Sequence, residues 1–137
     1  MNKALEWSLE IQNEISMWRR ELHKIPELGL NLPQTTAFIT TKLDEWGVNY
    51  TVCKNCTGVV ALLGKAGGKC IALRADMDAL PIKEETGVEY ASTNENMHAC
   101  GHDAHATMLL GVAKVLKGHE DQLNGYVKLF FQPGEEG

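Results

Sequence analysis

The chain has no long apolar run and no excess of basic residues. No apolar stretch in its 137 residues is as long as a membrane span, and the amphipathic segment 1–18 does not have the form of a signal peptide. The formal net charge of −5 argues against a nucleic-acid-binding surface. Together these absences predict a cytoplasmic protein that binds neither membranes nor nucleic acids.

Cysteine is also sparse, with only four residues, at positions 53, 56, 70 and 100. In a cytoplasmic protein such cysteines are expected to be free thiols or metal ligands in preference to disulfides. Cys53 and Cys56 form a C-x-x-C pattern, but a redox motif of this kind should open a helix after a strand. Here the pair lies between two strand-like segments, and no second ligand pair has matching spacing. We therefore predict a hairpin turn with two thiols and no role in metal binding.

The apolar residues recur with a helical period in some segments and with a strand period in others. Helices are expected from residue 11 to about 23, from 33 to 46 and from 104 to 117. Strands are expected at 48–52, 58–63, 70–75 and 126–131. The segment 70–75 is nearly all apolar, which predicts a strand buried on both faces. The predicted fold class is α/β, with a mixed, largely parallel sheet flanked by helices.

The side chains most suggestive of chemistry are concentrated in residues 97–105. This stretch contains three His, one Cys and one Asp directly before the helix 104–117. Cys100 and His102 flank Gly101, so a tight turn would let both converge on one ion. The N-terminus of the helix should also favour the thiolate of Cys100, which is the form that binds metal. The plainer alternative is a helix start with incidental His.

Two pairs of carboxylates are expected to reach the same place. The order strand 70–75, helix 104–117 and strand 126–131 predicts two parallel strands. Asp76 and Asp78 then share one edge of the sheet with Glu135 and Glu136, and the helix N-terminus lies there too. A Cys, a His and a carboxylate suit a divalent ion such as Zn, Mn, Co or Ni. One Glu would face the ion while the other takes a proton from water, unless the Glu pair is only a solvated loop.

Several other assignments stay open on the sequence. Asp76 and Asp78 could bind a metal, orient a ligating His from behind, or cap a strand end, and we favour the orienting role for one of them. His98 and His105 could each be a ligand, a substrate contact or a helix-surface residue. The two remaining histidines, at positions 23 and 119, are expected to be ordinary surface residues.

Five stretches, in the same order along the chain, resemble the M20 metallopeptidase superfamily. They are WRRELH, PELG, RADMDALP, MHACGHDAH and FQPGEEG. The similarity is to the amidohydrolase branch, which includes aminoacylases, hippurate hydrolases and auxin-conjugate hydrolases. It implies a zinc-peptidase-like catalytic fold in which Cys100, His102 and Glu136 are metal ligands and Glu135 is the general base. Members of this branch hydrolyse the amide of N-acyl amino acids, usually with two divalent ions.

The resemblance also implies that further His ligands and a dimerisation domain lie beyond residue 137. We therefore expect residues 1–137 to be the N-terminal portion of a metal-dependent catalytic domain. The whole protein is expected to be a homodimeric amidohydrolase that acts on small N-acyl amino acids or on related amides and dipeptides. This portion alone is expected to be inactive, and the alternative function is a metal-binding fragment without turnover.

Overall fold

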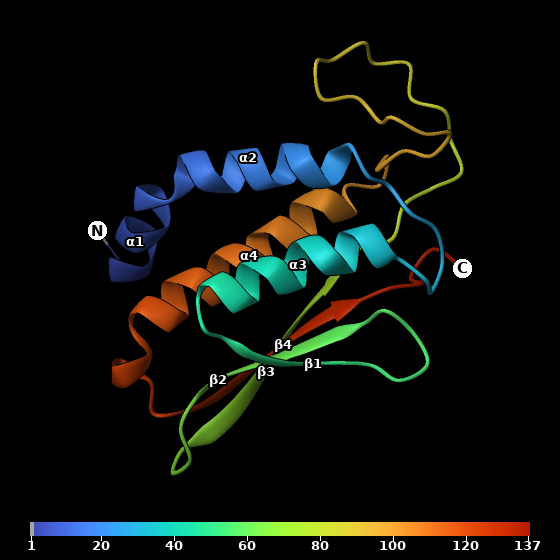
Figure 1. Ribbon diagram of the computed structural model, residues 1–137. Coiled ribbons are helices and arrows are strands. Elements are labelled where there is room, and N and C mark those ends of the chain that lie inside the picture. The colour runs from blue at the N-terminus through green and yellow to red at the C-terminus, as the bar shows by residue number, and fades with distance from the viewer. Residues whose placement is uncertain (1) are drawn as a thin grey trace.

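A mixed sheet is the framework of the fold (Figure 1). In the computed structural model, which describes residues 2–137, the strands lie in the order β1 (Asn49–Val52), β2 (Val59–Gly64), β4 (Gly125–Gln132) and β3 (Lys69–Asp76). β2 is antiparallel to both β1 and β4, whereas β3 is parallel to β4. The predicted α/β class is confirmed, but the expectation of a largely parallel sheet is wrong. A short hairpin joins β1 to β2, and such a connection permits only antiparallel pairing.

Helices cover one face of this sheet. Figure 1 shows α2 (Gln12–His23), α3 (Pro33–Glu45) and α4 (His102–Gly118) on the same side of the strands. The helices predicted to begin near residues 11, 33 and 104 are confirmed, and the sequence analysis missed the short α1 (Lys3–Glu10) and the 3₁₀ turn η1 (Glu120–Gln122). Over residues 2–137, no helix combines the length and the apolar character that crossing a membrane requires.

The hydrophobic core lies between these helices and the covered face of the sheet. β2 shows the arrangement clearly, because Val59, Ala61 and Leu63 are buried while the alternate Leu62 is exposed. Large apolar side chains of the core come from all three covering helices and from β4, and they include Trp18, Leu22, Ile39, Leu43, Leu110, Leu129 and Phe131. The core therefore fixes α2, α3 and α4 against one side of the strands.

β3 contradicts the expectation of a strand buried on both faces. Within residues 2–137 it is an edge strand, with β4 as its one neighbour in the sheet, and its first six residues are exposed. Ile71 and Leu73 are 58% and 40% exposed. An apolar sequence therefore did not determine burial here, because a strand is covered only where the fold supplies neighbours. Its last two residues, Ala75 and Asp76, are buried.

The order β3, α4, β4 gives the parallel pair that the sequence predicted. Pairing runs in register from Lys69 opposite Gly125 to Asp76 opposite Gln132. Between β3 and α4 the chain makes a long excursion, residues 77–101, which is the yellow-to-orange loop above the end of α2 in Figure 1. Within this loop Leu80 and Met97 form an isolated antiparallel bridge. We call residues 77–101 the crossover loop.

Leu63→Ala should lower the free energy of unfolding by about 2–5 kcal/mol, because it removes a buried side chain and leaves a cavity. Leu62→Ala is the matched control on the same strand, since Leu62 is 37% exposed and Leu63 only 1%. Its cost should be clearly smaller. Urea unfolding of both variants measures the difference, and equal losses would contradict a core built on one face of the sheet.

Candidate metal centre

The carboxyl ends of β3 and β4 are tied together just beyond their last paired residues. Asp76 lies opposite Gln132, and the N–H of Met77 donates to the carbonyl of Gln132 at 3.0 Å. The N–H of Glu136 then donates to Oδ2 of Asp78 at 2.9 Å. The two carboxylate pairs that the sequence placed at one edge of the sheet therefore do lie together.

Gly101 shapes the start of α4. It is the N-cap residue and has φ +99°, a left-handed conformation that L side chains rarely adopt. The turn brings Cys100 and His102 toward the same point as Glu136, and one ligand atom from each of the three lies within 4.8 Å of the others. The structure thus brings together the three residues that the sequence analysis proposed as ligands.

The ring of His102 is held so that one nitrogen faces the cluster. The ring is buried, and its Nδ1 donates to the carbonyl oxygen of Asp78 at 2.8 Å. Nε2 is thereby turned toward the cluster, and it lies 3.5 Å from Asp76 Oδ1, 3.6 Å from Glu135 Oε2 and 3.6 Å from Glu136 Oε1. An imidazole fixed through Nδ1 with Nε2 free is the usual arrangement of a His that binds metal.

His105 joins the cluster through Asp76. Its Nδ1 lies 2.6 Å from Asp76 Oδ1, and Arg74 Nη1 lies 3.2 Å from Asp76 Oδ2. Burial raises the pKa of Asp76, but the hydrogen bond from His105 and the nearby His102, His105 and Arg74 outweigh it, so the pKa is lowered overall. Asp76, His102 and His105 form a second group whose ligand atoms lie within 4.8 Å of one another. This group shares His102 with the first.

Cys100 does not have the electrostatic environment that the sequence predicted. Its pKa is raised, first by a hydrogen bond with Glu136, then by burial and by the negative charges of Glu136, Glu135 and Asp76. The expected preference for thiolate at the helix N-terminus is therefore wrong, because three carboxylates oppose it. A divalent cation would reverse this balance, since a nearby metal lowers the pKa of a thiol. Sulfur, imidazole nitrogen and carboxylate oxygen together fit a borderline divalent ion.

His98 belongs to neither ligand group among the described residues. It is 4% exposed, and neither of its ring nitrogens has a hydrogen-bond partner in the described part of the chain. The pKa of His98 is lowered to about 4, chiefly by burial; the charges of Asp103 and Asp78 raise it, whereas His23 and His102 lower it. The ring is therefore neutral near pH 7.

The expectation that His23 is an ordinary surface residue is wrong. It is 3% exposed, with Nδ1 2.7 Å from Asp103 Oδ2 and Nε2 3.0 Å from Glu84 Oε1. Arg19, one helical turn earlier, places its Nε 2.9 Å from the same Asp103 oxygen. The spacing of four between Arg19 and His23 was a signal that the two share a helix face. The second supposed surface residue, His119, is half-buried and stacks on Trp7.

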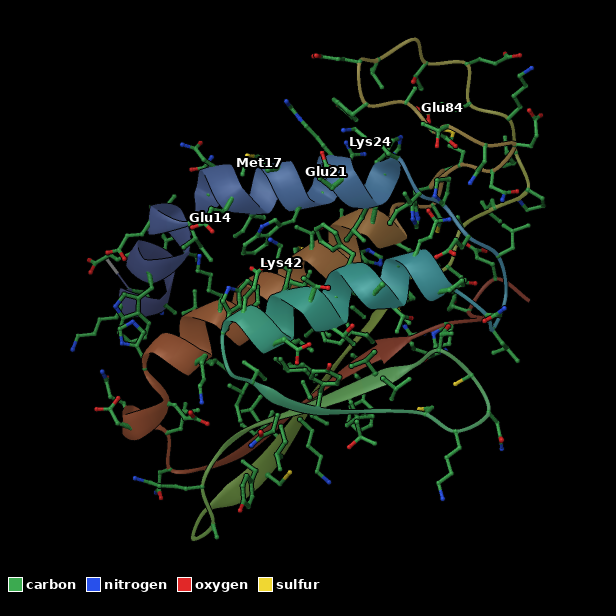
Figure 2. All side chains as sticks on the ribbon, in the orientation of Figure 1. Glu14, Met17, Glu21, Lys24, Lys42 and Glu84 are labelled. Atoms are coloured by element: carbon green, nitrogen blue, oxygen red, sulfur yellow. The ribbon has the colours of Figure 1, made fainter. Side chains whose placement is uncertain are left out.

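Glu84 is the unexpected member of this buried group. Figure 2 shows it on the crossover loop, beside the end of α2. Burial raises its pKa, but hydrogen bonds from the Thr86 hydroxyl, the Ser92 N–H and the His23 ring lower it to about 2. The sequence analysis treated this part of the loop as irregular and polar, and no local pattern marked Glu84.

Comparison with known proteins finds similarity to one family. Residues 72–137 match peptidase family M20/M25/M40. IAA-amino acid hydrolase ILR1-like 5 of Arabidopsis thaliana is 51% identical over 120 residues, which cover 87% of this chain and 28% of that protein. N-acetyl-L-cysteine deacetylase of Bacillus subtilis (strain 168) is also 51% identical over 120 residues, which cover 86% of this chain and 29% of that protein. Residues 72–137 therefore match the M20 peptidase family, and the chain is similar to its members over most of its length.

The solved structures agree with this family. A dinuclear metal-binding M20 peptidase from Bacillus subtilis is 40% identical, with a TM-score of 0.87, over 93% of this chain and 36% of that chain. The family resemblance seen in the sequence is therefore confirmed. The chain spans less than a third of the length of the two curated relatives, at 28% and 29%.

Glu84 should make the stability of this chain sensitive to acid. Because its pKa falls from 4.5 to about 2 on folding, it stabilises the fold above pH 4.5, and this contribution is lost as the pH falls toward 2. The free energy of unfolding of Glu84→Gln should decline less steeply over this window than that of the wild type. Urea unfolding at successive pH values measures the slopes. Glu89→Gln, an exposed position on the same loop, is the control and should follow the wild type.

Proposed function

We propose that this chain is the N-terminal portion of the catalytic domain of a metal-dependent amidohydrolase. The reaction is hydrolysis of the amide bond of N-acyl amino acids, or of related small amides and dipeptides. The observation that carries the proposal is the approach of Cys100, His102 and Glu136 to within 4.8 Å of one another, with Glu135 beside them. The names of the two curated relatives, one acting on an IAA-amino acid and one on N-acetyl-L-cysteine, support this substrate class.

Cys100, His102 and Glu136 would hold a divalent ion, with Zn, Mn, Co and Ni as the candidates. Such an ion, when bound, lowers the pKa of a water molecule and polarises a carbonyl oxygen. We propose two ions in the whole protein. The dinuclear centre of the Bacillus subtilis M20 peptidase and the two overlapping ligand groups of this chain support that number.

Glu135 is proposed as the general base. Its side chain is 41% exposed, more than the 24% of Glu136, so both water and substrate can reach it. It takes a proton from the attacking water and later donates this proton to the leaving amine nitrogen. The main chain of Glu136 is fixed by its hydrogen bond to Asp78, and the Glu136 carboxylate faces Cys100. This difference in exposure and contacts supports separate roles, with Glu135 as the base and Glu136 as the ligand.

Asp78 and Asp76 are proposed to orient the imidazoles. The carbonyl of Asp78 fixes Nδ1 of His102, which leaves Nε2 directed at the cluster. The carboxylate of Asp76 holds His105 at 2.6 Å beside the same ring. Groups that support metal ligands in this way typically affect metal affinity or activity by about 10–100-fold when removed.

We also propose that the whole protein is a cytoplasmic homodimer. All four cysteines are free thiols, which fits a reducing compartment. Dimerisation rests on the family resemblance alone.

Glu135→Gln and Glu136→Gln should separate the base from the ligand. In the whole protein, Glu135→Gln keeps the side-chain volume but cannot accept a proton, so kcat should fall by about 10²–10⁴ while metal content is retained. Glu136→Gln removes a charged oxygen donor and should lower metal content. Elemental analysis beside an assay with an N-acetyl amino acid measures both effects. If Glu135→Gln loses the metal and Glu136→Gln keeps it, the roles are reversed. Normal hydrolysis by both variants would refute the mechanism.

Cys53→Ser/Cys56→Ser should leave metal content and hydrolysis of the whole protein unchanged. The two residues form the predicted hairpin, in which the N–H of Cys53 donates to the carbonyl of Gly58 at 2.8 Å, and within residues 2–137 they join no group able to hold an ion. Cys100→Ser is the matched control and should lose metal affinity. Loss of metal from the double variant would show that the hairpin thiols contribute to the centre.

A further inference from the structure

His23 connects three segments that are distant in the sequence. From the last turn of α2 its ring reaches Asp103, 80 residues away in the first turn of α4, and Glu84, 61 residues away in the crossover loop. Both neighbours are carboxylates, whose oxygens only accept hydrogen bonds, so the ring satisfies both by donating from each nitrogen. A buried imidazole with a carboxylate on either side is a bridge rather than an incidental contact.

The side chains that form this bridge are shielded from solvent, and both carboxylates have further hydrogen-bond partners. The side chains of His23, Asp103 and Glu84 are 4%, 0% and 2% exposed. Asp103 also receives Nε of Arg19 at 2.9 Å, and Glu84 receives the N–H of Ser92 at 2.6 Å. Burying charged groups is costly, and its best-attested benefit is that it selects one arrangement of the segments involved. The bridge is therefore suited to fixing geometry.

Both segments held by His23 carry residues of the metal centre. Asp103 directly follows His102, so its position sets the first turn from which the His102 ring projects. The crossover loop contains Glu84 and has Asp78 near its start and Cys100 near its end. The same loop is tied to the end of α2 beside His23, since the Thr93 hydroxyl donates to the carbonyl of Lys24 at 3.1 Å.

We propose that His23 is a positioning residue for the metal centre. It holds the start of α4 and the crossover loop at a fixed distance, so that Cys100 and His102 meet Glu136. It acts through Asp103 and Glu84 and touches neither substrate nor metal. The inference rests on the proposed function, because it assumes that Cys100 and His102 bind an ion.

The test uses the whole protein and Co²⁺, whose thiolate-to-cobalt absorption reports a Cys ligand independently of turnover. The amide of His23→Gln carries its N–H donors on a single nitrogen and an acceptor oxygen on the other side, so one carboxylate must face an oxygen. The variant should fold but bind Co²⁺ about 10–100-fold more weakly, with weaker thiolate-to-cobalt absorption. With an N-acetyl amino acid, kcat should fall by a similar factor while KM changes little.

Two controls separate positioning from general loss of stability. Leu63→Ala destabilises the core without touching the bridge and should keep the wild-type cobalt spectrum and kcat under conditions where it is folded. His119→Gln makes the same substitution at the other end of α4, where the ring stacks on Trp7, and should also match the wild type in both readouts. A changed spectrum in either control would overturn the assignment of the effect to the bridge.

The double variant His23→Gln/Glu84→Gln tests the bridge itself. A second amide can donate to the Gln oxygen at position 23, so cobalt absorption and kcat should lie between those of the wild type and His23→Gln. If His23→Gln does not fold, the same measurements on the double variant should still fall below the wild type. Wild-type behaviour of either variant would overturn the positioning role. No thiolate-to-cobalt absorption in the wild type would instead refute the proposed centre and the inference with it.

Discussion

The in-register parallel pairing of β3 with β4 is the constraint on which the rest of the site depends. It ends with Asp76 opposite Gln132, so both chains leave the sheet at the same level. The turn after each strand then has little freedom, and the hydrogen bond from the Glu136 N–H to Asp78 closes the gap between them at 2.9 Å. A slip of one residue would turn the side chains of one strand to the opposite face and separate the carboxylates.

The same edge is electrostatically unfavourable without a compensating cation. Asp76, Glu135 and Glu136 all lie within 3.6 Å of His102 Nε2, and the charges of these three carboxylates raise the pKa of the Cys100 thiol. A divalent ion would offset these negative charges and would also favour the thiolate. The arrangement is therefore better suited to binding a cation than to stabilising the fold.

Beyond Met77, which belongs to the apolar core, the crossover loop is joined to the end of α2 by polar contacts. The Asn94 amide donates to the carbonyl of Pro26 at 3.0 Å, and the Thr93 hydroxyl donates to that of Lys24. The strands and helices, by contrast, are held by a continuous apolar core. The position of Cys100 thus depends on directional hydrogen bonds and buried charges, which break over short displacements. The apolar packing of α4 alone does not fix the loop that precedes it.

The sequence by itself determined the elements, the motifs and their meeting place. Helical and strand periods located α2, α3, α4 and the strands, because periodicity records which side of each element faces the core. The order strand, helix, strand was enough to bring Cys100, His102 and Glu136 to one edge, since parallel strands share their carboxyl ends.

Only the tertiary structure decided which residues are buried and which charges meet. The apolar β3 proved to be an exposed edge strand, because burial depends on which strands lie beside it in the sheet. His23 resembled a surface residue because its partners Asp103 and Glu84 lie 80 and 61 residues away. The raised pKa of Cys100 was hidden for the same reason, since it results from carboxylates that approach through space. Local pattern gives the period of an element, whereas the distance between two charges exists only once the chain has folded.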